Sequence, residues 1–210
     1  MNDPKFIKPF GPCIYSNLIT DDILLTLKNC KKLSENKNEN VGHLLAGALA
    51  KQLRLIITPE QHQKILDHIF EHLGMYMAES PVTLKEKFTF DSDDIWLNIQ
   101  QAGEFNPAHH HSGEISGVVY LEIPNEILEE NRKSTDAAGV GFHSYGQISF
   151  YYGEDISCPT YFHMMPRPGQ IILFPAKLKH AVNPFFSKVE RVSIAFNIIE
   201  KSKAKTKNIK

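Results

Sequence analysis

The chain has 210 residues, of which 42% are hydrophobic, 22% charged and 10% aromatic. This length suffices for one domain with a sizeable core, and the composition excludes a disordered or collagen-like chain. With 23 Lys and Arg against 24 Asp and Glu, the net charge of -1 argues against a nucleic acid as the main partner.

Targeting and redox signals point to a cytoplasmic protein. No apolar run reaches the roughly 18 residues of a membrane span, so no membrane partner is expected. The first residues lack the charged and apolar regions of a secretory signal. The three cysteines (Cys13, Cys30 and Cys158) form no CxxC pair, which fits a reducing compartment.

Residues 1 to about 80 are predicted to be helical. The first helix should begin after Thr20, a suitable N-cap, because Asp21 and Asp22 then occupy the first turn, where the helix dipole favours negative charge. Apolar residues follow at helical spacing. They are Ile23, Leu24, Leu27, Cys30 and Leu33.

A second helix start lies at Thr58-Pro59-Glu60, with proline at the first helical position, and Gly74 is the predicted stop. Residues 38–56 are also predicted as a helix, on weaker grounds because the segment contains two glycines. Three histidines lie on the second helix, but without an HExxH pattern they favour a surface helix over a zinc site. They are His62, His68 and His72.

From about residue 82 the hydrophobic period changes from helical to two. Short runs rich in β-branched and aromatic residues, bounded by Gly, Pro, Asn or Ser, predict strands. They are residues 94–101, 115–123, 146–153, 169–175 and 191–199. Strands without long helices between them imply an antiparallel sandwich or barrel, and the preceding helices would buttress one sheet.

The predicted organisation is therefore one mainly β domain over residues 1–210, with N-terminal α-helices in 1–80 and the β core in 82–200. Residues 125–146 form a polar connection too long for a hairpin, and such loops are often lids. Residues 201–210, which carry five lysines, are predicted to be a basic, disordered tail.

Three histidines are candidates for a metal site. His109 and His111 are two residues apart in an extended segment, so their imidazoles point to the same face and can converge on one ion. His180, after the run 169–175, is the best candidate for a third ligand. Imidazole is a common ligand of transition metals. The alternative is an exposed histidine loop without metal.

The last strand carries a second candidate site. Arg191, Ser193, Ala195 and Asn197 share one face, and four apolar residues share the other. An arginine can grip a carboxylate through two hydrogen bonds, and a serine on the same face can add a third. The alternative is an edge strand with a solvated arginine.

Together these motifs resemble the Fe(II)/2-oxoglutarate-dependent oxygenases, and in particular a subfamily often seen in tailed phages and marine bacteria. The resemblance covers roughly residues 93 to 199. It rests on Trp96-x-Asn98, Gly103, His109-x-His111, Ser116 to Leu121, Pro168-Gly169, Phe174-Pro175, His180 and Arg191-x-Ser193-Ile194-x-Phe196-Asn197. Each motif is weak alone, but their common order is specific.

The resemblance implies a double-stranded β-helix (a jelly-roll, cupin-like) with Fe(II) at one mouth. The family's usual triad has two histidines and one carboxylate, whereas this chain has His111 where an acid is usual. Three interpretations stay open: an all-histidine triad of His109, His111 and His180; a carboxylate supplied by Glu114; or an open position at Gly113.

The resemblance also implies the cosubstrates 2-oxoglutarate and O2. Arg191 and Ser193 would bind the remote carboxylate of 2-oxoglutarate, while Tyr120 and Asn98 would contact cosubstrate or substrate. Tyr120 could equally be a core tyrosine. The expected reaction hydroxylates an unactivated C–H bond and releases succinate and CO2.

Two alternatives remain at this stage. One is a cupin-like three-histidine metalloenzyme that does not use 2-oxoglutarate, for which metal binding would be indifferent to Arg191. The other is a non-catalytic binding module associated with a phage or virion. The substrate is either a small molecule or a peptide or protein, and neither its identity nor the oligomeric state follows from the sequence.

Overall fold

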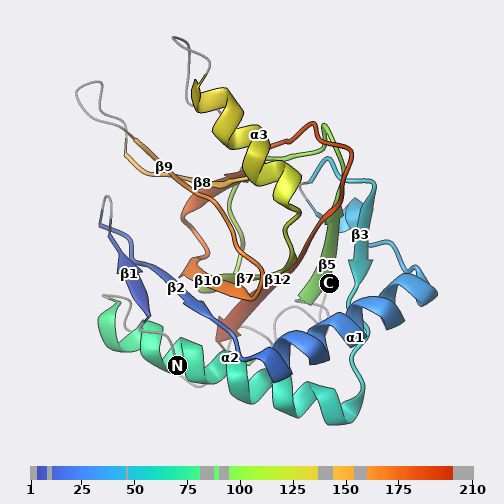
Figure 1. Ribbon diagram of the computed structural model, residues 1–210. Coiled ribbons are helices and arrows are strands. Elements are labelled where there is room, and N and C mark those ends of the chain that lie inside the picture. Colours follow the sequence, from blue (N-terminus) through green and yellow to red (C-terminus); the bar gives the residue numbers. More distant parts are fainter. Residues whose placement is uncertain are drawn as a thin grey trace.

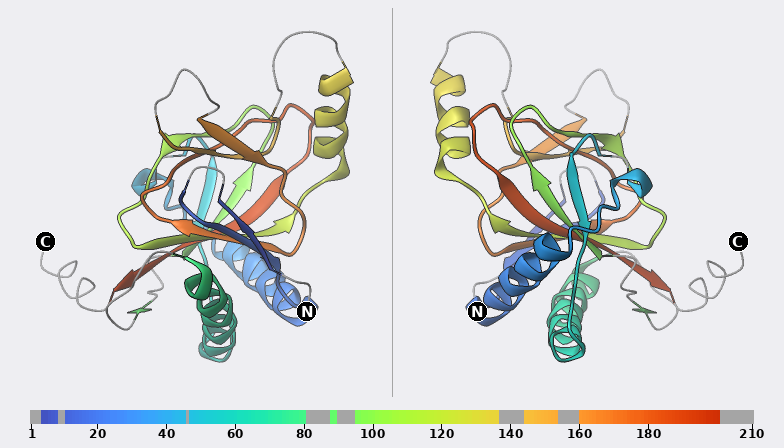
Figure 2. Two further views of the ribbon diagram at one scale, coloured as in Figure 1. Left: turned by 90° about the vertical axis from the view of Figure 1, so that its left-hand side faces the viewer. Right: turned by 90° about the vertical axis from the view of Figure 1, so that its right-hand side faces the viewer.

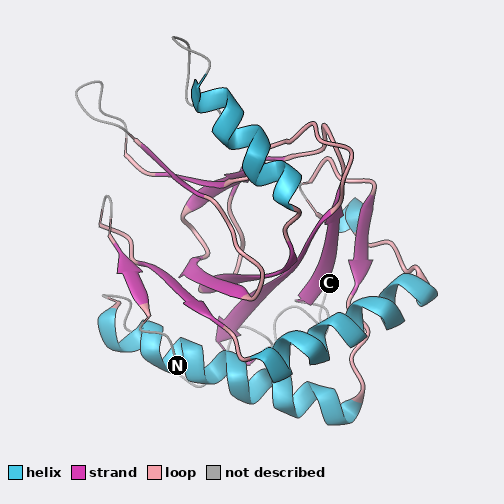
Figure 3. Cartoon of the chain, viewed as in Figure 1, coloured by secondary structure: helices cyan, strands magenta, loops and turns pink. Residues whose placement is uncertain are grey.

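The computed structural model describes residues 4–8, 11–45, 47–80, 88–89, 95–136, 144–153 and 160–200. Two antiparallel β-sheets face each other, and helices α1 (Asp21–Lys37) and α2 (Pro59–Glu79) pack together against the outer face of the larger one (Figures 1 and 2). Figure 3 shows how strands dominate the part of the chain that follows α2. This is the predicted mainly β fold with N-terminal helices.

The larger sheet has eight described strands in the order β1-β2-β10-β7-β12-β5-β3, with β4 paired to β12. Its strands are β1 (Lys5–Ile7), β2 (Ile14–Leu18), β3 (Lys51–Arg54), β4 (Phe88–Thr89), β5 (Ile95–Gln100), β7 (Ile115–Glu122), β10 (Gln170–Pro175) and β12 (Arg191–Glu200). The smaller sheet has the order β6-β11-β8-β9. Its strands are β6 (Asn106–His109), β8 (Ile148–Tyr151), β9 (Tyr161–Met164) and β11 (Lys179–Val182).

Side-chain alternation in the larger sheet produces two cores. Val192, Ile194 and Ile198 of β12 pack with the apolar stripes of α1 and α2. Between the sheets, Val118 and Tyr120 of β7 pack with apolar residues of β8 and β10. Because successive residues of a strand point to opposite faces, the strand that buries apolar side chains under the helices must turn its other face into the jelly-roll.

Both predicted helix starts are confirmed. The Thr20 hydroxyl accepts a hydrogen bond from Ile23 N at 3.4 Å. Thr58 and Gln61 form a capping box, in which each side chain bonds the other residue's backbone N–H. These caps satisfy amide groups that a helix end leaves without internal partners.

The predicted helix over residues 38–56 is wrong. The segment forms a short 3-10 turn, η1 (Gly42–Leu44), and then β3, which pairs with β5 along Lys51 to Arg54. Residues 1–80 also contain β1 and β2, so this part is mixed rather than helical. Sheet pairing here outweighs the helical propensity of the Ala- and Leu-rich sequence.

The predicted helix stop at Gly74 is also wrong, since α2 continues to Glu79. A helical glycine costs only about 1 kcal/mol relative to alanine. Tyr76, two residues after Gly74, is 0% exposed. The burial of its ring under the sheet more than offsets the cost of the glycine.

The polar connection over residues 125–146 contains helix α3 (Asn125–Asp136) rather than loop alone. The Glu130 carboxylate fixes α3 by accepting hydrogen bonds from Phe186 N and from the backbone and hydroxyl of Ser187, at 2.6 to 3.1 Å. Residues 137–143 and the predicted basic tail, 201–210, lie outside the described residues. None of the described helices has the length and apolar character needed to cross a bilayer.

Candidate metal and cosubstrate site

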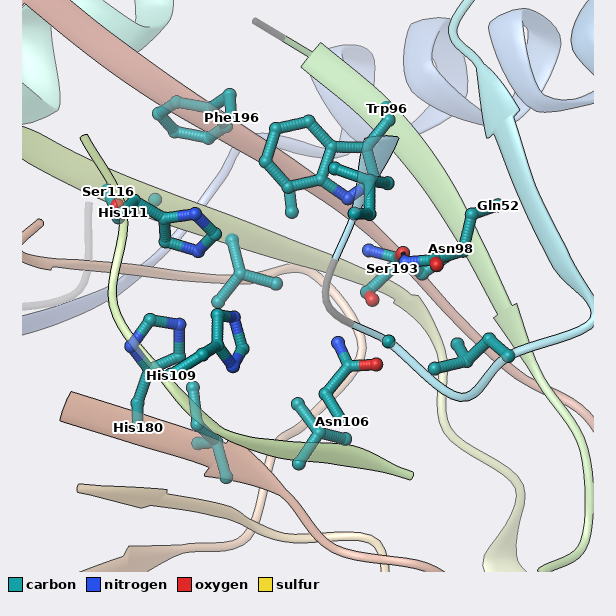
Figure 4. Close-up of a pocket in the computed structure, with 18 of the residues that line it drawn as sticks. Gln52, Trp96, Asn98, Asn106, His109, His111, Ser116, His180, Ser193 and Phe196 are labelled. Carbon is teal, nitrogen blue, oxygen red and sulfur yellow. Dashed lines mark hydrogen bonds between the residues drawn. The ribbon is translucent and has the colours of Figure 1, made fainter. Parts of the chain in front are cut away.

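The three candidate histidines come together between the sheets. His109 ends β6 and lies directly opposite His180 of β11, while His111 is held two residues further on by the hydrogen bond from its N–H to Ala176 O, 2.8 Å long. One ligand nitrogen of each imidazole lies within 4.8 Å of the others. Figure 4 shows the rings pointing toward one another. His110, between them in sequence, is exposed and outside this cluster.

Backbone carbonyls set the tautomer of two of these rings. His109 Nδ1 lies 2.7 Å from Pro107 O, and His180 Nδ1 lies 2.9 Å from Leu178 O. Because a carbonyl oxygen can only accept, each Nδ1 carries the proton and each Nε2 keeps its lone pair. An imidazole fixed in this way is oriented to bind a metal through Nε2.

Burial keeps two of the three imidazoles neutral, those of His180 and His111. It lowers the pKa of His180 to about 3 and that of His111 to about 4, and the neighbouring His109 lowers both further. Only the neutral imidazole can bind a cation, so these two rings are in the metal-binding form at neutral pH.

A cavity of about 650 Å³, including its open mouth, connects the histidines to the interior face of the larger sheet. Asn98, Tyr120, Arg191 and Ser193 line it, as do residues that the sequence did not single out for the site. The latter include Leu45, Gly47, Leu49, Gln52, Asn106, Ile148 and Val182.

A row of polar side chains crosses four strands of the larger sheet along this cavity. Residues in register occupy the same face of a sheet, so the row follows directly from the strand pairing. Its members, in order across β3, β5, β12 and β7, are Gln52, Asn98, Ser193 and Tyr120. Within the row, Gln52 Nε2 donates to Asn98 Oδ1 at 2.9 Å.

Arg191 is a buried cation that has no counter-ion among the residues the structure describes. The residue lies at the start of β12 and is 2% exposed. Its Nη1 donates a hydrogen bond to Gly146 O at 2.8 Å, and its guanidinium carbon lies 5.6 Å from the centre of the Tyr120 ring. Its Nε is buried without a hydrogen-bond partner. No carboxylate of the described residues forms an ion pair with it, and burial lowers its pKa.

Tyr120 belongs to the core between the sheets and also lines the cavity. Burial raises the pKa of its hydroxyl to about 12, so the phenol stays protonated. Glu114 has a different position. It neither lines the cavity nor joins the histidine cluster, and its backbone bonds to Ile198 O and Ala176 N.

The surface-helix prediction is wrong for His72, which is 3% exposed. Its Nδ1 lies 2.6 Å from the Tyr15 hydroxyl, and its Nε2 lies 3.1 Å from His68 Nε2. The buried face of α2 thus carries a polar contact to β2, and His72 has a structural role.

Comparison with known proteins identifies the family. The model of a family described as "Putative 2OG-Fe(II) oxygenase" matches residues 94–197, which include every strand that lines the cavity except β3. The chain belongs to this oxygenase family. It is accordingly an oxidoreductase. No curated protein matches it.

Solved structures share the fold of this oxygenase at low sequence identity. A prolyl-4-hydroxylase from Pseudomonas putida is 15% identical, with a TM-score of 0.59 over 90% of this chain and 92% of that one. A Trichoplax adhaerens prolyl hydroxylase in complex with a hypoxia inducible factor peptide is 13% identical, with a TM-score of 0.60 over 93% and 86%. HygX from Streptomyces hygroscopicus, with nickel and 2-oxoglutarate bound, is 9% identical, with a TM-score of 0.56 over 91% and 83%. The predicted jelly-roll is confirmed.

Sequence reasoning missed Gln52 and Asn106 of the oxygenase for different reasons. Gln52 lay in a segment read as helix. Asn106 and His109 are three residues apart, which strict alternation would place on opposite faces. Opposite them, His180 and Val182 are only two apart, so β6 contains one extra residue. Such a bulge re-aims side chains, and here both Asn106 and His109 line the cavity.

Proposed function

We propose that this oxygenase binds Fe(II) through His109, His111 and His180. The converging nitrogens, the carbonyl-fixed tautomers and the low pKa values of the buried rings support this assignment. Within the described residues the cluster contains no carboxylate, unlike the usual triad of two histidines and one acid. An all-histidine set leaves the metal site one unit more positive, which should strengthen its hold on an anionic cosubstrate.

The cosubstrate in this proposal is 2-oxoglutarate, with its remote carboxylate on Arg191. The single observation that carries the proposal is a buried guanidinium without counter-ion in the same cavity as three metal-competent imidazoles. A buried unpaired charge is costly, and a carboxylate would supply both the missing charge and an acceptor for the free Nε. Ser193 and Asn98, neighbours in the polar row, and the protonated Tyr120 would complete the cosubstrate site.

With O2, bound iron and 2-oxoglutarate supply the chemistry for hydroxylating an unactivated C–H bond, with release of succinate and CO2. The chain's own part is to hold and shield the reactants. Arg191 anchors one end of the diacid and the histidines fix the metal, while Trp96 and Val182 form apolar walls that exclude water.

The substrate in this proposal is a small molecule or a peptide that reaches the metal through the open mouth of the cavity. The prolyl hydroxylase in complex with a peptide supports the peptide alternative, because a protein of similar fold binds a peptide. Cytoplasmic location, phage origin and the exclusion of nucleic acid remain predictions from sequence.

The chain's only tryptophan makes metal binding directly measurable. The Trp96 ring centre lies 5.9 Å from that of His111. Anaerobic addition of Fe(II), or of Ni(II) as a redox-inert substitute, should quench Trp96 fluorescence. The variants His109→Ala and His180→Ala should lose this quenching, whereas His110→Ala, a matched control on the exposed face, should retain it.

Cosubstrate binding has a separate readout, the weak visible charge-transfer band expected when 2-oxoglutarate joins the Fe(II) protein. Arg191→Ala should lose the band at 2-oxoglutarate concentrations that saturate the parent protein, yet keep metal quenching. Quenching without any band in the parent protein would instead indicate a three-histidine metalloenzyme that does not use 2-oxoglutarate. Quenching that survives His180→Ala would refute the metal assignment.

A further inference from the structure

Two carboxamides in the cavity have acceptor oxygens that no group in the described part of the chain satisfies. Gln52 is 1% exposed; its Nε2 donates to Asn98, but its Oε1 is buried without a partner. Asn106 Oδ1, on the opposite sheet, is likewise buried without a partner. Leaving such a group unsatisfied costs about 1–3 kcal/mol, so two of them in one cavity indicate a ligand that donates hydrogen bonds.

Both oxygens lie against the same backbone position, Gly47, which has no side chain. A Cβ added to Gly47 would lie 3.0 Å from Gln52 Oε1 and 3.0 Å from its Nε2, and would clash with Asn106 Oδ1. The strand-like segment around Gly47 is fixed in place, because Ala48 N donates to Phe105 O and Ala50 N donates to the Glu104 carboxylate, each at 2.9 Å. The fold therefore brings the two carboxamides together at this glycine.

The cosubstrate cannot fill this role. At neutral pH 2-oxoglutarate is a dianion with a ketone, so it offers acceptors and no donors, and its carboxylates would be repelled by two carbonyl oxygens. In Figure 4 Asn106 points into the cavity beside the histidines, in position to meet a second ligand near the metal. The partner of these oxygens is then the substrate.

The charge of the cavity further restricts that substrate. Among the described residues, its lining includes Arg191 and no Asp or Glu, and the proposed metal would add positive charge. A cationic group such as an ammonium would be desolvated there without a counter-ion, which is strongly unfavourable. A neutral N–H group fits both the acceptors and the charge.

We infer that Gln52 and Asn106 form a substrate subsite that accepts hydrogen bonds from a neutral amide N–H, of a carboxamide or of a peptide bond. This inference rests on the proposed function, since it assigns the substrate side of the same cavity. It makes Gln52 and Asn106 specificity-determining residues, and Gly47 the residue whose missing side chain lets both carboxamides approach the backbone.

The test uses protein loaded with Ni(II) and 2-oxoglutarate and small probes that differ in their donors. Acetamide mimics a carboxamide, N-methylacetamide a peptide bond, N,N-dimethylacetamide has no donor, and methylammonium is cationic. Binding is followed by saturation-transfer NMR and Trp96 fluorescence. Since one hydrogen bond contributes about 1 kcal/mol, the better N–H amide should bind about fivefold tighter than N,N-dimethylacetamide.

The ranking of probes decides the source of the amide. Tighter binding of acetamide would indicate a carboxamide, because its two N–H groups can meet both oxygens, and tighter binding of N-methylacetamide would indicate a peptide bond. Equal binding of N,N-dimethylacetamide, or tightest binding of methylammonium, would overturn the inference.

Two variants locate the subsite. Gly47→Ala would displace the two carboxamides, since its Cβ clashes with Asn106 and crowds Gln52, and Asn106→Leu removes one of the oxygens. Each variant should abolish the preference for N–H amides. The matched controls are Gly74→Ala, where a Cβ meets nothing within 4 Å, and Gln63→Leu, an exposed carboxamide on α2. Both controls should keep the preference. If the parent protein fails to bind Ni(II) and 2-oxoglutarate, the proposed function fails; if it binds them without discriminating the probes, only the subsite fails.

Discussion

Replacing Arg191 by methionine should separate stability from cosubstrate binding. The guanidinium is buried, bonded to one carbonyl and stacked near Tyr120, but without a carboxylate partner. Methionine has a similar length and no charge to desolvate, so Arg191→Met should not strongly destabilise the ligand-free protein. It should nevertheless remove the group that holds the diacid.

The magnitude follows from three contributions. Losing the charged hydrogen bond to Gly146 costs about 1.5–3 kcal/mol, and losing the contact with the Tyr120 ring costs about 0.5–2 kcal/mol. Removing an uncompensated buried charge returns several kcal/mol. The losses sum to about 2–5 kcal/mol and the return is of the same size, so the free energy of unfolding of the ligand-free variant should stay within about 2 kcal/mol of that of the parent.

The assay is urea and thermal unfolding of Ni(II)-loaded protein with and without 2-oxoglutarate. At a 2-oxoglutarate concentration of 100 times its dissociation constant, the ligand should stabilise the parent by about 2.7 kcal/mol. For a chain of this size, this gain should raise the Tm by roughly 5–10 °C. Arg191→Met should show no such shift. Arg167→Met, which alters an exposed arginine, should keep it.

Two results would refute this reasoning. A ligand-free Arg191→Met protein less stable than its parent by more than about 3 kcal/mol would mean that the guanidinium stabilises the fold by itself. A 2-oxoglutarate shift that survives the substitution would mean that the diacid binds elsewhere.

Three further predictions concern stability. Burial and the neighbouring His68 lower the pKa of His72 to about 4, below the unfolded value of about 6.5, so the unfolded chain binds the proton more readily. The stability that neutral His72 contributes is therefore complete above about pH 6.5 and falls by about 3 kcal/mol as the pH approaches 4. His72→Leu should flatten the pH dependence of the urea midpoint. A pH dependence as steep as that of the parent would contradict this. Gly117→Ala would drive a Cβ into the Phe196 ring and to 2.9 Å from Leu173 Cδ2, and should cost about 1–3 kcal/mol in urea unfolding, whereas the control Gly74→Ala should cost nothing. Thr58→Ala removes half of the α2 capping box and should lower the free energy of unfolding by about 1 kcal/mol, and an unchanged value would show that the cap is dispensable.

Local signals in the sequence determined much of the fold. Caps at Thr20 and Thr58 act within one helical turn, so they can be read without knowing any tertiary contact. The alternation in β5 and β12 likewise has a local cause, because the period of a strand fixes which side chains share a face.

Local signals failed where distant contacts decide. The segment that became β3 has helical composition, and only pairing with β5 makes it a strand. Asp- and Glu-rich residues 125–136 looked like a polar loop, but the contact of Glu130 with Phe186 and Ser187 anchors a helix there. In both cases the partner lies more than 40 residues away in sequence.

The sequence alone therefore indicated the candidate groups of the proposed site: histidines two apart before a strand, a distant third histidine, and an arginine and serine on one face of the last strand. It could do so because spacing within a strand is a local property. Only the tertiary structure decided which groups meet and which remain without partners. Three features depend on chain segments that folding brings together: the β6 bulge, the β3–β5 register and the enclosure of Arg191. These features decide which side chains line the cavity.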